Sequence, residues 1–150
     1  MPDDALFMKL AIAEALKGQA TAAPNPIVGA VIVEDGEVVA AGFHVRPTEA
    51  HAEVIALKNL GRPPKPGATM YVTLEPCSTA GRTGACTEVL KESGITEIVL
   101  GAVDPNPDHR GRGITLLREA GINVRTGVLE QECTDLNPDF NERMTNAQKE

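Results

Sequence analysis

The chain has 150 residues, enough for one domain with a buried core, and 42% hydrophobic with 23% charged residues indicates a soluble globular protein. Its net charge of −7 disfavours broad nucleic-acid binding, which depends on a basic surface facing the phosphates. With three Phe, one Tyr and no Trp, the chain has few aromatic rings on which single-stranded bases could stack.

The predicted elements begin with a helix and a hairpin and then alternate between helix and strand. In chain order they are a helix over 3–17, strands over 27–33 and 37–43, a helix over 51–60, a strand over 69–74, a helix over 87–93, a strand over 96–103, a helix over 113–120, a strand over 121–125 and a terminal helix over 130–144 interrupted near 137–138. This order predicts a three-layer α/β/α fold with a mixed, mostly parallel central sheet. We expect one domain over residues 1–144 and a polar tail over 145–150.

Three cysteines are too few for a disulfide framework, and the N-terminus lacks the pattern of a secretory signal. No apolar run approaches the ~18 residues of a membrane span. We therefore expect a cytoplasmic protein. Two of the cysteines are interpreted below as metal ligands, and Cys133 is expected to be a half-buried structural thiol.

The most informative pattern combines His51-Ala52-Glu53 with Pro76-Cys77 and Cys86. One imidazole and two thiolates are ligands that zinc prefers in a tetrahedral site, and three of them leave the fourth position open for water. Such a layout is typical of zinc hydrolytic deaminases. The pattern therefore predicts a site for one Zn²⁺ formed by His51, Cys77 and Cys86.

Glu53 lies two residues after the histidine, where its carboxylate can sit beside the water without binding the metal. Hydrolytic deamination needs a group that takes a proton from water, protonates the ring and later protonates the leaving amine, and Glu53 suits that role. A purely structural zinc would take a fourth protein ligand. Cys133, His44 and His109 are the available residues, and none forms a convincing pair with the other three.

Several further segments carry a family resemblance. They are Pro24-Asn25-Pro26-Ile27-Val28-Gly29, Gly42-Phe43-His44, Tyr71-Val72-Thr73-Leu74-Glu75-Pro76-Cys77-Ser78, Gly81-Arg82-Thr83, Asp104-Pro105-Asn106-Pro107 and Gly111-Arg112-Gly113-Ile114. With these segments and the eight residues between Cys77 and Cys86, the chain resembles the deaminase domain of riboflavin biosynthesis proteins, within the cytidine deaminase-like superfamily. The resemblance covers about residues 5–144.

The resemblance implies deamination of 2,5-diamino-6-(5-phospho-ribosylamino)-pyrimidin-4-one. It also implies that substrate is contacted by Asn25, His44, Ser78, Arg82, Asp104 and Asn106. Amide, carboxylate and guanidinium groups suit a ring edge, hydroxyls and a phosphate, respectively. Each position also has a plainer interpretation, as a rigid turn, a structural histidine or a solvated loop residue.

Two departures from the family pattern stand out. Thr79 replaces a histidine that contacts substrate, and Gly84-Ala85 replaces a Pro-Pro pair. Many family members also continue into an NADPH-dependent reductase domain, which we do not expect in this chain, so a separate reductase is a possible partner. The resemblance further implies a homodimer or tetramer.

Two alternatives remain open. Because of Thr79, the substrate could be another nucleobase, a nucleoside or a pterin-like compound. From a different class, the chain could be a non-catalytic, zinc-stabilised interaction module, in which Glu53 would have no functional role. A tRNA-editing deaminase is disfavoured by the acidic composition and the long gap between the cysteines.

Overall fold

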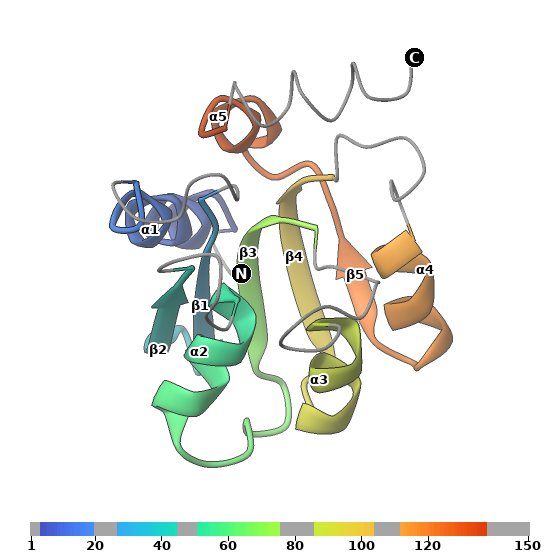
Figure 1. The fold of residues 1–150 in the computed structure, drawn as a ribbon. Helices are drawn as coiled ribbons and strands as arrows, with labels where there is room; N and C mark the ends of the chain where they lie inside the picture. The colour runs from blue at the N-terminus through green and yellow to red at the C-terminus, as the bar shows by residue number, and fades with distance from the viewer. Residues whose placement is uncertain (1–3, 20–26, 45–50, 76–85, 104–111, 138–150) are drawn as a thin grey trace.

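The computed structural model describes residues 4–19, 27–44, 51–75, 86–103 and 112–137. In chain order the elements are α1 (Asp4–Leu16), β1 (Gly29–Glu34), β2 (Glu37–Phe43), α2 (Ala52–Leu60), β3 (Thr69–Leu74), α3 (Cys86–Ser93), β4 (Glu97–Ala102), α4 (Arg112–Glu119), β5 (Asn123–Arg125) and α5 (Glu130–Thr134). Figure 1 shows their arrangement.

The described strands form one five-stranded sheet in the order β2-β1-β3-β4-β5. β1 pairs antiparallel with both β2 and β3, whereas the β3–β4 and β4–β5 pairs are parallel. Four strands therefore run in one direction and β1 runs against them. This is the mixed, mostly parallel sheet that the sequence predicts.

Helices cover both faces of the sheet and so make three layers (Figure 1). One face packs against α2, α3 and α4 through a core that includes Ile32, Met70 and Leu100. The other face packs against α1 and α5 through a core that includes Met8 and Tyr71. All six residues of β1 are buried, which explains why the strand is apolar from Gly29 to Val33, whereas Glu34 at its end is paired with Arg62.

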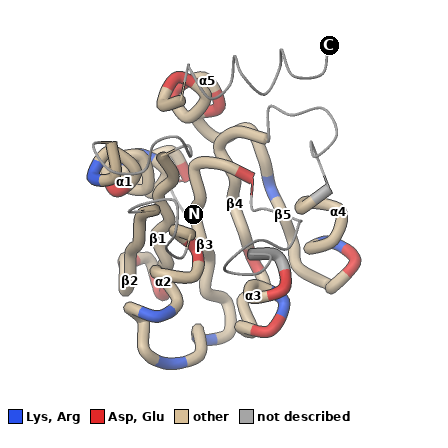
Figure 2. Tube along the Cα trace, in the orientation of Figure 1, with Lys and Arg blue, Asp and Glu red and all other residues tan. Residues whose placement is uncertain are grey.

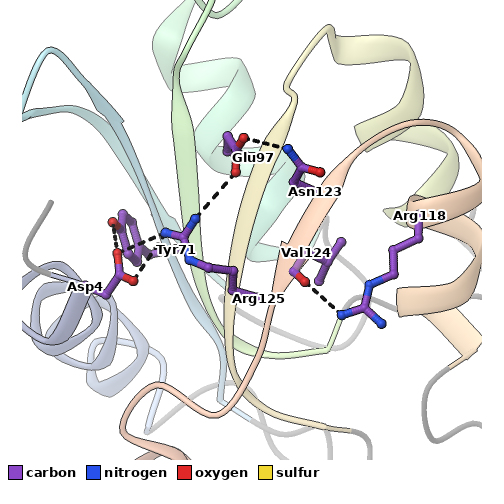
Figure 3. A network of polar contacts seen from close by, with 7 residues as sticks. All are labelled: Asp4, Tyr71, Glu97, Arg118, Asn123, Val124 and Arg125. Atoms are coloured by element: carbon purple, nitrogen blue, oxygen red, sulfur yellow. Dashed lines mark hydrogen bonds and ion pairs between the residues drawn. The ribbon is translucent and has the colours of Figure 1, made fainter. Parts of the chain in front are cut away.

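The first helix is held to the sheet by polar contacts as well as by its apolar face. The Tyr71 hydroxyl donates to Asp4 Oδ1 over 2.6 Å, and Arg125 Nη2 lies 3.1 Å from the same oxygen. Arg125 also reaches Glu97, which accepts a hydrogen bond from Asn123 (Figure 3). The network joins the start of α1 to β3, β4 and β5, at positions up to 121 residues apart in the chain.

Most element boundaries agree with the predictions to within two residues, and two of the differences have clear local causes. The last strand begins at Asn123 rather than Gly121, because α4 ends in a Schellman motif. Gly121 has a φ of 89°, its N–H donates to Arg118 O, and the Ile122 N–H donates to Leu117 O. These bonds commit residues 121 and 122 to the helix end.

The terminal helix is also shorter than predicted. α5 ends at Thr134. The N–H groups of Leu136 and Asn137 then donate to Cys133 O and Thr134 O, each three residues back in the chain. Residues 138–144 of the predicted helix lie outside the described residues. Cys133 is 3% exposed, so it is a fully buried thiol rather than the half-buried one expected.

Within the described residues, no helix has the length and apolar character required to cross a membrane. Figure 2 shows acidic and basic residues interspersed along the described chain, without a continuous stripe of Lys and Arg.

Candidate active site

The described residues of the predicted site lie at one edge of the sheet. β2, β3 and β4 end at this edge because they are parallel to one another, and β1 begins there because it runs the other way. The helices that follow β2, β3 and β4 start at the same edge. Carboxyl ends of parallel strands, with helix N-termini above them, are where α/β folds bind small ligands.

His51 is the N-cap of α2, with φ −75° and ψ 166°, so it precedes the first helical residue. The prediction placed it within the first turn, and the structure corrects this by one position. The His51 carbonyl accepts the N–H of Ile55 over 3.1 Å, which fixes the backbone at the start of the helix. The His51 side chain makes no capping hydrogen bond to the helix, unlike the Ser, Thr, Asn and Asp side chains that usually occupy this position.

Gly42 sets how closely α2 lies on the sheet. A Cβ atom at this position would lie 2.6 Å from Ala56 N and 2.7 Å from Ala52 O, inside the contact distance of any real side chain. The absence of a side chain therefore lets the backbones of β2 and α2 meet. This close approach fixes the height of His51 and Glu53 above the strand ends.

Glu53 is the second residue of α2 and is 3% exposed. Burial of a carboxylate costs free energy unless polar groups or a helix terminus compensate it. The N-terminal end of α2 supplies part of this compensation, because its backbone N–H groups favour negative charge. A buried acid beside the first predicted ligand is the arrangement that proton transfer requires.

His44 follows the last residue of β2 and is 2% exposed. Its ring meets the ring of His51 edge to face, with centroids 5.0 Å apart and planes at 83°. The structure therefore brings together the predicted ligand His51 and the predicted substrate contact His44.

The helix that begins at Cys86 packs against α2. The prediction that Cys86 stands at a helix start is confirmed, and only the backbone of this residue is described. Helix N-termini favour thiolate over thiol, so the position suits a metal ligand. No cluster of three or more His, Cys, Asp or Glu side chains forms within the described ranges, which omit Cys77.

Glu75 is a site-edge residue to which the sequence assigned no role. It is 6% exposed, its N–H donates to Ala102 O over 2.9 Å, and its Oε2 accepts the N–H of Gly113 over 3.0 Å. The first bond extends the β3–β4 pairing to within two residues of Cys77. The second joins this strand end to the start of α4.

The remaining predicted site residues lie outside the described residues. They are Asn25, Cys77, Ser78, Arg82, Asp104 and Asn106. Their flanking described residues end or begin at the same edge as His51 and His44.

A family model described as the cytidine and deoxycytidylate deaminase zinc-binding region matches residues 1–102. The chain belongs to this family. The predicted superfamily and its metal are therefore confirmed, and His51, Glu53 and Cys77 fall within the matched residues together with Cys86.

Relatives of this deaminase domain agree in sequence and in structure. Riboflavin biosynthesis protein RibD of Aquifex aeolicus is 48% identical over 137 residues, covering 91% of this chain and 38% of that protein. Acinetobacter baumannii RibD has a TM-score of 0.89 at 40% identity, covering 95% of this chain and 40% of that one.

The third relative is the Thermotoga maritima diaminohydroxyphosphoribosylaminopyrimidine deaminase/5-amino-6-(5-phosphoribosylamino)uracil reductase. Its TM-score is 0.87 at 43% identity, over 96% of this chain and 42% of that one. The predicted fold and the predicted resemblance to riboflavin biosynthesis proteins are confirmed. The chain spans about two fifths of the length of these relatives.

Proposed function

We propose that this deaminase domain catalyses the hydrolytic deamination of 2,5-diamino-6-(5-phospho-ribosylamino)-pyrimidin-4-one in riboflavin biosynthesis. The observation that carries the proposal is the buried carboxylate of Glu53, in the first turn of the helix that His51 caps. The 48% sequence identity between this chain and a riboflavin biosynthesis protein supports the choice of substrate.

We assign the metal to His51, Cys77 and Cys86. The donor set fits zinc, because one imidazole and two thiolates match its preferred ligands and leave one position open. His51 at the start of α2 and Cys86 at the start of the neighbouring α3 support this assignment. When bound, zinc supplies the Lewis acidity that makes water reactive near neutral pH.

Glu53 moves the protons in this mechanism. Its carboxylate takes a proton from the attacking water and transfers it to the ring nitrogen as the new C–O bond forms. It then takes the second proton from the added hydroxyl and gives it to the amine, so that the C–N bond breaks, ammonia leaves and the carbonyl forms. Burial keeps competing water away from the carboxylate and strengthens its hydrogen bonds to the reacting groups. The proposed substrate contacts are His44, Asn25, Ser78, Arg82, Asp104 and Asn106.

The deciding experiment is an ammonia-release assay on the zinc-loaded protein, with the phosphoribosyl compound and its unphosphorylated analogue compared in parallel. Release from the phosphorylated compound alone is the expected result. Equal release from both would move the substrate to another nucleobase, nucleoside or pterin-like compound, the class that Thr79 favours. No release from either, with one zinc per chain, would refute this substrate.

We further propose that the deaminase domain occupies residues 1–144, with 145–150 as a polar tail. The proposed setting is the cytoplasm, and a separate NADPH-dependent reductase would act on the product.

A homodimer or tetramer is supported by three leucines exposed on α1, namely Leu6, Leu10 and Leu16 at 50%, 41% and 46%. Sedimentation equilibrium tests the assembly, and a monomer at micromolar concentration would contradict it.

A further inference from the structure

Asn137 forms two hydrogen bonds with the backbone of a single distant residue. Its Oδ1 accepts the N–H of Ile27 over 2.6 Å, and its Nδ2 donates to Ile27 O over 2.9 Å. The two residues are 110 positions apart in the chain. The side-chain amide therefore acts as a neighbouring strand would, because it satisfies both backbone groups of Ile27 at once.

Apolar contacts reinforce this attachment. The side chain of Ile27 is 7% exposed and clusters with Ala15 of α1, and Leu136 packs against the same cluster. The start of β1 is thus clamped between the end of α1 and the residues that follow α5. A segment held by two hydrogen bonds and by packing has little freedom to shift.

The clamp continues to the site through the next residue. Val28 O accepts the N–H of His44 over 3.1 Å, so the backbone of His44 is positioned by the segment that Asn137 holds. On the other side, a Cβ at Gly18 would lie 2.4 Å from His44 O, which shows how closely the turn after α1 supports this residue. The His44 ring in turn meets the His51 ring.

We propose that Asn137 is a positioning residue for the deamination reaction, which aligns His44 with His51 by holding the backbone of Ile27. The inference rests on the proposed function for its catalytic consequence, since His44 is a proposed substrate contact. Displacements of about 1 Å in such a contact can reduce rates by up to about 100-fold, even when the altered residue lies away from the chemistry.

The test compares two identical chemical changes at different places. Asn137→Asp keeps the acceptor for the Ile27 N–H but replaces the donor with an oxygen that repels Ile27 O. Asn123→Asp is the matched control. Asn123 lies on β5, away from the site edge, and its Nδ2 donates to Glu97 in the network of Figure 3. Its substitution by Asp changes the net charge by the same amount as Asn137→Asp does.

With one zinc retained per chain, we expect Asn137→Asp to raise KM for the phosphoribosyl substrate by about tenfold or more. The control should stay within about twofold of the wild type. A purely structural role would lower the melting temperature and leave KM unchanged. Equal KM values in wild type and Asn137→Asp would therefore overturn the proposal.

Amide hydrogen exchange supplies a readout that does not depend on turnover. The His44 N–H should exchange faster in Asn137→Asp than in the control, relative to the Val99 N–H in the sheet centre. Unchanged His44 protection would refute the positioning role. If the wild type fails to deaminate the substrate, the proposed function is wrong, and this exchange ratio still decides whether Asn137 positions His44. Should Asn137→Asp fail to fold, Asn137→Ala removes both bonds without adding charge and must show the same two changes.

Discussion

The carboxylate of Glu75 accepts a hydrogen bond from the backbone N–H of Gly113 over 3.0 Å, and 38 positions separate the two residues. Gly113 is the second residue of α4, so the bond satisfies one of the N–H groups that a helix start leaves free. A negative charge is also favourable there, because the helix dipole is positive at this end. The bond therefore ties the end of β3, two residues before Cys77, to the helix that follows β4.

The first prediction is that Glu75→Ala lowers the free energy of unfolding by about 1–3 kcal/mol, because the buried Gly113 N–H loses a charged acceptor. Urea unfolding of the zinc-loaded protein measures the change. Glu88→Ala is the control, since the Glu88 side chain is 61% exposed and its pair with Lys91 lies on the surface. Its loss should stay below about 0.5 kcal/mol. Equal losses in the two variants would show that Glu75 has no special role in joining β3 to α4.

Local patterns in the sequence were sufficient for the elements and for much of the site. The boundaries of β3 match the prediction because Thr69–Leu74 consists of β-branched, aromatic and aliphatic residues that favour strands. Gly61 ends α2 as predicted, with a left-handed φ of 72°. The Asp35-Gly36 turn also has positive φ at both residues, as a two-residue hairpin requires.

Contacts between distant parts of the chain were beyond such patterns. The Glu75–Gly113 and Asn137–Ile27 pairs depend on which strand lies beside which helix, and periodicity does not specify this. The need for glycine at position 42 likewise arises only when α2 lies against β2. For Glu75, a charged residue directly after an apolar strand was the one local sign of a buried role.

The second prediction concerns the proton shuttle. Glu53→Gln preserves the size of the side chain and removes its ability to carry a proton, so kcat should fall by about 10²–10⁴-fold. Zinc content should remain at one per chain, as measured by atomic absorption. Glu37→Gln makes the same chemical change at the exposed start of β2 and should leave kcat unaffected. A Glu53→Gln enzyme with near-normal turnover and bound zinc would rule out the shuttle role.

The third prediction distinguishes the three cysteines by their reactivity. Burial and, to a smaller extent, the nearby Glu132 carboxylate together raise the pKa of the Cys133 thiol to about 12. Because the thiolate is the reactive form, native Cys133 should react very slowly with a disulfide reagent at pH 8. We expect slow modification of all three thiols in the zinc-loaded protein, rapid modification of two after chelation, and of the third only in denaturant.

Mass spectrometry after peptide digestion should assign the two chelator-released thiols to Cys77 and Cys86. Cys133→Ala serves as the control and should leave the two-thiol phase intact while removing the denaturant-dependent one. Rapid labelling of Cys133 after chelation alone, in a protein that keeps its native circular dichroism, would contradict the assignment of metal ligands.

The fourth prediction is a pH dependence that originates at the opposite end of the sheet. Glu34, at the end of β1, accepts hydrogen bonds from Arg62 at 2.6 and 3.0 Å and from the Lys65 N–H at 2.9 Å. The hydrogen bonds from Arg62 and then from Lys65 lower the pKa of Glu34 from its ordinary value of 4.5 to about 2.

A carboxyl whose pKa is lower in the folded state stabilises the fold fully above its unfolded pKa. Protons then bind the unfolded chain more strongly as the pH falls, so this stabilisation declines from about pH 4.5 and is lost near pH 2. Glu34→Gln removes the titration, and its urea midpoint should therefore fall less steeply than that of the wild type across this interval. Zinc release at low pH affects both proteins alike, so the difference between the curves isolates Glu34. Glu88 belongs to an exposed pair, so Glu88→Gln should keep the wild-type slope of urea midpoint against pH. Parallel curves for the wild type and Glu34→Gln would show that the Glu34–Arg62 pair does not persist in solution.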